Sequence, residues 1–115
     1  MVDRTQQIID ALKDTPDIKW ISDSWPTAKA VYPCIVVDLA SERNTDRRDD
    51  RPYLGEYEYY VRIFAVTRPP MLRILEEIDK RMAGIGYERT FRHEQNEPGV
   101  KQWVMRYRTA VYADA

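Results

Sequence analysis

The sequence predicts a single α+β domain, a mostly antiparallel sheet of four to five strands with two helices packed on one face. Two observations predict this class. Apolar residues repeat with the period of a strand in several segments but with the period of a helix in only two, and the strand segments are grouped on either side of the second helix. The 115 residues, 43% hydrophobic and 32% charged, suit one domain, so residues 1–115 are assigned to it.

The expected order is helix, three strands, helix and two strands. The expected elements are a helix over residues 3–14, strands over 18–21, 34–39 and 57–67, a helix over 70–83, and strands over 87–94 and 100–112. Pro26 and Pro33 keep the chain between the first two strands out of the sheet.

The first helix is predicted from three apolar residues on one side: Ile8, Ile9 and Leu12. Asp3 or Thr5 is available as its N-cap, and Thr15-Pro16-Asp17 stops the pattern. A short amphipathic helix is therefore expected at the N-terminus.

The second helix follows Pro69-Pro70, which are tolerated in a first turn, and ends at Gly84 and Gly86. Its apolar stripe is Met71, Ile74, Leu75, Ile78 and Met82. Its outer side is expected to carry Glu76, Glu77, Lys80 and Arg81. We expect the stripe to pack on a sheet face that bears Val61, Ile63, Trp103 and Met105.

The clearest strand runs from Tyr57 to Thr67 and is expected at or near the centre of the sheet. Its core face carries Tyr57, Tyr59, Val61, Ile63 and Ala65, and Glu58 and Arg62 mark the other face. The last two strands are predicted to form a hairpin, because Pro98-Gly99 matches the central pair of a type II turn. Strict alternation over 87–94 would place four residues together: Tyr87, Arg89, Phe91 and His93.

The segment from Ser41 to Gly55 is a connection of fifteen residues between two predicted strands, a length that in small domains is usually functional or disordered. Its charges are four of each sign: Glu42, Arg43, Asp46, Arg47, Arg48, Asp49, Asp50 and Arg51. Two interpretations stay open. The segment is either a solvated hairpin tip or an arm that orders on assembly, with arginines of one copy pairing with aspartates of the next. Thirteen arginines against five lysines fit the second interpretation, because arginine favours bidentate interface contacts.

Composition restricts the class of protein. Eighteen basic and nineteen acidic residues leave a formal charge of −1, so any binding to nucleic acid or anionic membrane must be local. The N-terminus is polar, so no cleaved export signal is predicted. The longest uninterrupted aliphatic run has three residues, Ile35-Val36-Val37, so no membrane span is predicted. One cysteine favours a reducing compartment.

Residue types suited to catalysis or metal binding are scarce. His93 is the only imidazole, and its neighbour Glu94 points to the opposite face of an extended strand, so the two cannot share a metal. Cys34 lies in an apolar strand and is predicted to be a core residue. Gly84-Ile85-Gly86 ends a helix, whereas a phosphate-binding loop precedes one. We expect no enzyme, no catalytic residue, no cofactor and no metal site.

One alternative is a small module that binds RNA or single-stranded DNA through the final hairpin. The residues that suggest it are Arg89, Arg92, Arg106, Arg108, Tyr87, Phe91, Trp103 and Tyr107. Against it, Trp103 and Tyr107 share a face with Met105, which is typical of a core, and Glu88 and Glu94 are available to pair with the arginines.

With this order of elements, the chain resembles the tail-terminator proteins of long-tailed bacteriophages and prophages, also called tail-completion or minor tail proteins. The resemblance rests on the N-terminal helix, Tyr32-Pro33-Cys34-Ile35-Val36-Val37, the long charged loop, the strand from Gly55 to Phe64, the helix after Pro69-Pro70 and the closing hairpin. It covers nearly the whole chain and depends on length and element order rather than on a catalytic motif.

The resemblance implies a non-enzymatic subunit that forms a ring, usually a hexamer, at the head-proximal end of the tail tube. Such a ring ends tube growth and joins the tail to the head. The implied partners are further copies of the chain, the tail tube protein and the head-completion or connector proteins, with DNA only passing through the lumen and no membrane. The implied location is the virion tail, and the host cytoplasm during assembly. The segment 41–55 would be the arm that faces the lumen or the last tube ring.

Overall fold

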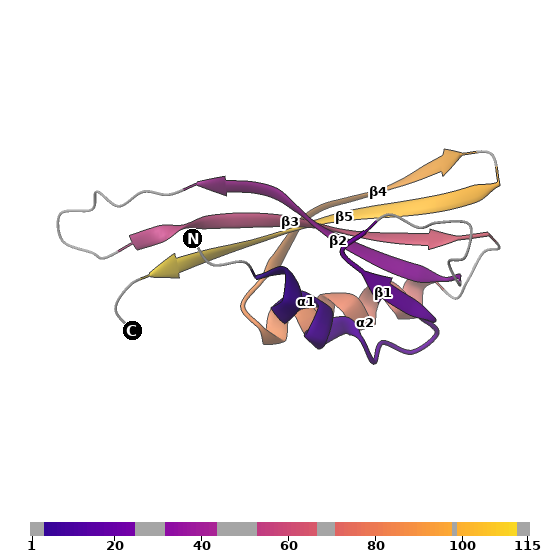
Figure 1. The fold of residues 1–115 in the computed structure, drawn as a ribbon, viewed down its shortest axis with the longest axis horizontal. Coiled ribbons are helices and arrows are strands. Elements are labelled where there is room, and N and C mark those ends of the chain that lie inside the picture. Colours follow the sequence, from indigo (N-terminus) through magenta and orange to yellow (C-terminus); the bar gives the residue numbers. More distant parts are fainter. Residues whose placement is uncertain (1–3, 25–31, 44–52, 67–70, 98, 113–115) are drawn as a thin grey trace.

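In a computed structural model of the chain, a twisted five-stranded sheet is covered on one face by two helices (Figure 1). The structure describes residues 4–24, 32–43, 53–66, 71–97 and 99–112. The elements are α1 (Thr5–Leu12), β1 (Trp20–Ser22), β2 (Cys34–Arg43), β3 (Tyr53–Ala65), α2 (Met71–Gly84), β4 (Glu88–Glu97) and β5 (Val100–Tyr112). The predicted α+β class and the order αβββαββ are confirmed.

The strands are arranged in the order β1-β2-β3-β5-β4, so β3 is central, as predicted. All pairs are antiparallel except β1 with β2, which is parallel, so the sheet is mixed. A parallel pair needs a connection of roughly a dozen residues, which the chain between Ser22 and Cys34 supplies. The molecule is elongated, 51 × 23 × 22 Å, because β2, β3 and β5 extend beyond the helices at one end and β4 and β5 at the other (Figure 1).

The first helix begins at Thr5, two residues after its predicted start at residue 3. Its N-cap is Arg4, without a side-chain capping bond, so the prediction of Asp3 or Thr5 as N-cap is wrong. Thr5 is the first helical residue, and Asp3 lies outside the described residues. The helix ends at Leu12, two residues before the predicted end at residue 14, and the Thr15 hydroxyl donates a hydrogen bond to the Leu12 carbonyl at 2.6 Å.

The apolar stripe of α2 is buried along its whole length, as predicted. Its buried members are Met71, Ile74, Leu75, Ile78 and Met82. They share one core with Val61, Ile63, Trp103 and Met105 of the sheet, which confirms the predicted packing. Residues Ile8 and Leu12 of α1 join the same core. The burial of these side chains holds both helices on one face of the sheet.

The outer side of α2 differs from the prediction at two positions. Glu77 and Arg81 are half-buried and form an ion pair, with 2.7 Å between Arg81 Nε and Glu77 Oε2. The Arg81 guanidinium also donates to the carbonyls of Ala11 and Asp14, at 3.2 and 3.3 Å. The end of α1 therefore covers this side of α2, and Arg81 satisfies carbonyls that a helix end leaves without partners.

The strict alternation predicted for residues 87–94 is wrong because β4 contains a bulge at Thr90. Arg89 is opposite Tyr107 in β5, but Phe91 is opposite Arg106, so Thr90 is an extra residue. After the bulge, Phe91 and His93 lie on the face away from the helices, while Arg92 and Glu94 lie on the helix side. The predicted β4–β5 hairpin itself is confirmed.

The long connection is shorter than predicted, because both flanking strands continue into it. Glu42 and Arg43 belong to β2, opposite Tyr57 and Glu56 of β3. Six of the predicted assembly residues lie outside the described residues: Asp46, Arg47, Arg48, Asp49, Asp50 and Arg51. Residues 41–43 read as a loop from their polar composition, although their backbone pairs with β3, so composition alone did not reveal the strand end.

Candidate interaction surfaces

The sheet face away from the helices carries a network of ion pairs across neighbouring strands. Arg62 of β3 lies 3.0 Å from Asp38 of β2 and donates to Gln102 of β5 at 3.1 Å. Arg106 of β5 lies 2.8 Å from Glu58 of β3. These side chains are partly buried, so their pairing is screened less than that of fully exposed charges.

The same network extends along the sheet through Arg108 of β5. Its guanidinium lies 3.3 Å from carboxylate oxygens of both Glu56 in β3 and Glu88 in β4. Tyr60 adds cation–π contacts, with the guanidinium carbons of Arg62 and Arg106 lying 4.5 and 5.7 Å from its ring centroid. This surface, from Asp38 in β2 to Glu88 in β4, is called the polar face below.

Beneath one end of the polar face lies a small apolar cluster. Its buried members are Cys34, Val36 and Phe64, with Trp20, Tyr32 and Val100 packed against them. The prediction of Cys34 as a core residue is confirmed, since its side chain is fully buried. Burial raises the pKa of its thiol to about 11, which keeps it protonated and inert at neutral pH.

The arginines that suggested nucleic-acid binding do not form one cluster. Arg106 and Arg108 are paired with carboxylates on the polar face, whereas Arg89 pairs with Asp79 of α2 on the opposite side. Trp103 and Tyr107 are buried in the core, as expected. Among the described residues of the network, four carboxylates face three arginines, so the polar face does not attract phosphate.

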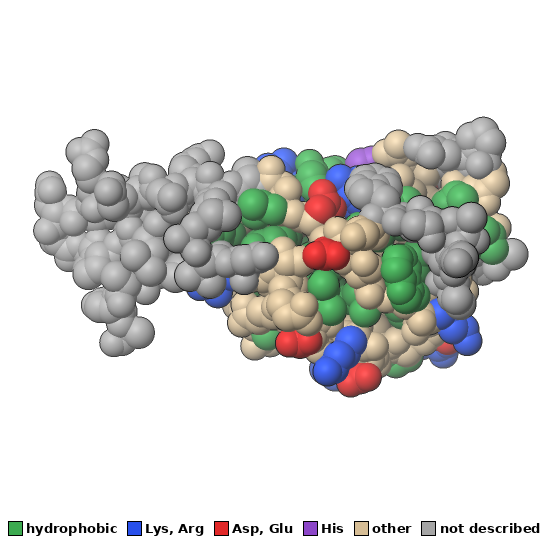
Figure 2. Space-filling model, viewed as in Figure 1, with side chains coloured by type: hydrophobic (Ala, Val, Ile, Leu, Met, Phe, Trp, Pro, Cys, Tyr) green, Lys and Arg blue, Asp and Glu red, His purple; other side chains and the backbone are tan. Residues whose placement is uncertain are grey.

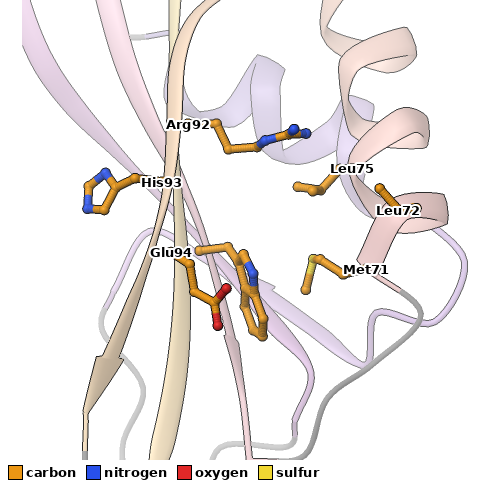
Figure 3. Close-up of a pocket in the computed structure, with 7 residues that line it drawn as sticks. Met71, Leu72, Leu75, Arg92, His93 and Glu94 are labelled. Atoms are coloured by element: carbon orange, nitrogen blue, oxygen red, sulfur yellow. The ribbon is translucent and has the colours of Figure 1, made fainter.

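His93 is exposed on β4 and its ring stacks on Phe91, with 5.3 Å between ring centroids. Figure 3 shows the imidazole pointing away from α2, while Arg92 and Glu94 point toward the helix side. Within the part of the chain that the structure describes, no group of three or more His, Cys, Asp or Glu side chains could hold a metal ion.

A partly buried hydrogen bond joins α2 to the sheet at Asp79. The Tyr107 hydroxyl donates to Asp79, whose carboxylate also accepts from Arg89 Nε at 3.1 Å. Burial and this bond raise the pKa of Tyr107 far above its ordinary value. The Tyr107 hydroxyl, the Asp79 carboxylate and the Arg89 guanidinium each have a partner in this arrangement. The arrangement therefore holds α2 against β4 and β5 and leaves none of these three groups free to react.

On the helix side, a cavity of about 430 Å³ lies between α2 and the outer strand β4 (Figure 3). The residues that line it are Met71, Leu72, Leu75, Arg92, His93, Glu94 and Trp103. Leu72 is 76% exposed there, and Arg92 has no ion pair with another described residue. Figure 2 shows hydrophobic side chains reaching the surface in separate patches between charged ones.

Sequence reasoning missed this cavity, because only the bulge at Thr90 turns Arg92 and Glu94 toward α2. The available signal for the cavity was Leu72, an apolar residue of α2 that lies next to the buried apolar stripe but is not part of it. The cavity lies at the edge of the sheet, because β4 is the last strand in the strand order.

The described helices are too short or too polar to span a membrane. No family model matches the sequence, and no curated protein matches it either. The fold is similar to that of a chain in a solved structure titled "Virion of native gene transfer agent (GTA) particle". The match has a TM-score of 0.54 at 6% sequence identity and covers 92% of this chain and 84% of that chain, so the two share a fold.

Proposed function

We propose that this chain is a non-enzymatic structural subunit of a phage-like virion. Its role is that of a tail terminator, forming a ring at the head-proximal end of the tail tube that ends tube growth and joins the tail to the head. The observation that carries the proposal is the fold shared with a chain of a virion particle over 92% of this chain. The element order that resembles tail terminators supports the finer role.

The described surface supports a role in assembly rather than catalysis. The arginines of its polar face are held in ion pairs, its histidine stacks on a phenylalanine, and its cysteine is buried. The residues that line its cavity include Arg92, His93 and Glu94 but no serine, threonine, cysteine or lysine that could act as a nucleophile. Such a surface suits binding to other proteins.

The charged segment 44–52, together with Glu42 and Arg43 at the end of β2, is proposed as an assembly arm. Its mixed signs let arginines of one copy pair with aspartates of the next or with a tube subunit. The arm lacks apolar residues that a core would need, so changing it should not affect the stability of the monomer.

A charge-reversal experiment tests the arm. Changing Arg47, Arg48 and Arg51 to Glu should abolish assembly, measured by light scattering and electron microscopy, without moving the melting temperature. The control reverses three exposed lysines elsewhere, Lys13, Lys19 and Lys80, with the same change in net charge. Normal rings from the arginine variant would show that the segment is only a solvated tip.

The finer function is tested by deleting the gene from the phage or prophage that carries it. Loss of a terminator should leave tails of uncontrolled length that carry no heads, beside full heads without tails, in electron micrographs. Supplying the wild-type chain from a plasmid should restore normal particles. Particles of normal length and composition from the deletion strain would contradict the proposed function.

A further inference from the structure

The described sheet has a free edge on each side. β4 pairs with β5 alone, so its outer edge has no partner strand. On the other side, β1 covers β2 only at Cys34–Val36, which leaves Val37–Arg43 without an outer partner. β2 and β4 run antiparallel to each other within the sheet. A second copy placed alongside in the same orientation would therefore bring its β2 against β4 in the antiparallel sense, with helices on the same side.

The two free stretches match in length. Between Val37 and Arg43, β2 offers six pairing positions, because Ala40 is the extra residue of a bulge. Between the bulge at Thr90 and its last residue, β4 offers the six positions 91–96 before Glu97. Aligning the two stretches puts Val37 opposite Asn96 and Arg43 opposite Phe91. Beyond Val37 the outer edge of β2 is taken by β1, and β4 continues only to Glu97, so the two strands overlap only at their ends, at Glu97 and Ser22.

This register brings an exposed apolar side chain to the cavity between α2 and β4. Leu39 is 42% exposed. It lies opposite Tyr59 of β3, whose side chain is buried on the helix side, so Leu39 is on the same side of the sheet. The register places Leu39 opposite Glu94, beside the cavity formed by Met71, Leu72, Leu75 and Trp103. Leu39 and Leu72 are two of the exposed large hydrophobic residues of the described chain, and this contact would bury both.

The same register also matches charge. The next position of β2 on the helix side after Leu39 is that of Glu42, opposite Tyr57. It falls opposite Arg92, whose side chain points to the helix side (Figure 3) and has no ion pair with another described residue. An opposite charge beside the exposed Arg92 guanidinium favours this pairing over its alternatives.

We propose that the edge of β4 and its cavity bind the β2 edge of another copy of this chain, with Leu39 at the cavity and Glu42 beside Arg92. The contact joins two different surfaces, so each copy keeps one free edge of each kind, and repetition closes into a ring when the rotation between copies allows it. The proposal rests on the proposed function only in that the partner is another copy. A two-fold pairing of β4 with β4 would leave Leu39 exposed and both β2 edges open.

Disulfide trapping tests the register. Ser41 falls opposite His93, and residues directly opposite in an antiparallel pair have Cα atoms about 4.5–5.5 Å apart, within reach of a disulfide. The Ser41→Cys, His93→Cys double variant, oxidised at concentrations where the protein associates, should give a ladder of covalent multimers on non-reducing gels. The control pair Ser41→Cys, Arg92→Cys is one position out of register and should give none. Native Cys34 is buried and should not contribute.

Charge exchange gives a second readout that needs no covalent bond. Arg92→Glu and Glu42→Arg should each weaken association by about tenfold or more in sedimentation equilibrium, and combining them should restore it. Leu39→Ser should weaken association similarly. Leu72→Ser tests the cavity side of the same contact.

The outcomes separate the two proposals. Rings that form normally but give no 41–93 cross-link overturn this interface and leave the proposed function standing. Strong cross-linking of His93→Cys to itself overturns the interface in favour of a two-fold dimer. Cross-linked ladders from a chain whose gene deletion leaves tails normal would support the interface and overturn the proposed function.

Discussion

The two faces of the sheet are stabilised by different forces. On the helix side, aliphatic and aromatic side chains of β3 and β5 are buried beneath α1 and α2. On the polar face, the same two strands present arginines and carboxylates that pair across the strands. The first face depends on the removal of apolar area from water and the second on charge pairing, so temperature, salt and pH act on them differently.

The largest expected effect comes from the helix side. Ile78 of α2 is fully buried, so Ile78→Ala should lower the free energy of unfolding by about 2–4 kcal/mol through lost burial and a residual cavity. Urea melts followed by circular dichroism measure it. Leu72→Ala on the same helix is the control and should change stability by less than about 0.5 kcal/mol, because Leu72 is 76% exposed. Similar losses at both positions would contradict the assigned orientation of α2.

Alkaline pH should weaken the helix side through its buried tyrosines. The pKa of Tyr107 is raised in the folded chain, so its proton stays bound in the folded state while the unfolded state releases it. Stability should therefore be complete below about pH 10, the ordinary tyrosine value, and fall as the pH rises further. Tyr107→Phe should flatten this alkaline loss, and at pH 7 should cost about 1–2 kcal/mol through loss of the bond to Asp79.

Tyr87 is the matched control for that experiment. Burial raises its pKa to about 12, but its hydroxyl has no hydrogen-bond partner among the described residues. Tyr87→Phe should therefore also reduce the alkaline loss between about pH 10 and pH 12, without the cost at pH 7. Equal costs at pH 7 would show that the Asp79 bond does not contribute to stability.

A smaller effect is expected on the polar face. A double-mutant cycle over Asp38→Ala and Arg62→Ala should give a coupling of about 0.5–1 kcal/mol that shrinks as salt is raised. The pair Asp17–Arg73 is the control, because the Arg73 side chain is 68% exposed and its coupling should be about 0–0.5 kcal/mol. A salt-independent coupling at Asp38–Arg62 would mean that packing rather than charge holds the pair.

The smallest expected effect concerns nucleic acid. The wild-type chain should show no binding to single-stranded RNA or DNA in fluorescence anisotropy at low salt, because the arginines of the polar face are neutralised by carboxylates. Arg106→Ala should then change nothing. Measurable binding that this variant weakens, with a flatter salt dependence, would instead favour the nucleic-acid module.

Much of the fold was predictable from periodicity, because burial imposes a period on each element. The stripe of α2 and the buried residues of β3 were predicted at the correct positions, and they define the core. The parallel partner of β2, the contact of Arg81 with the end of α1 and the bulges at Ala40 and Thr90 were not predicted. These features depend on which backbone groups meet across elements, and no local pattern records that.

The candidate surfaces were less predictable than the core for the same reason. The eight residues predicted as an assembly site were chosen for charge, and the structure describes only Glu42 and Arg43 of them, in a strand. The cavity beside β4 combines residues from three elements, and it requires both the order of the strands and the bulge at Thr90. Sequence reasoning therefore recovered residue types suited to assembly but not the edges that carry them.

The bulge at Thr90 also bears on how this chain tolerates change over evolutionary time. Among the described residues, the Thr90 hydroxyl makes one hydrogen bond, to the carbonyl of Arg106, so exchange of this side chain should be accepted readily. Deletion of the residue is a different event. It would join Arg89 directly to Phe91, with both still opposite their present partners in β5, so Arg92 and Glu94 would stay on the helix side and Phe91 and His93 on the polar face. At this position the pairing of Phe91 with Arg106, rather than the identity or the presence of the bulged residue, is the trait that selection should preserve.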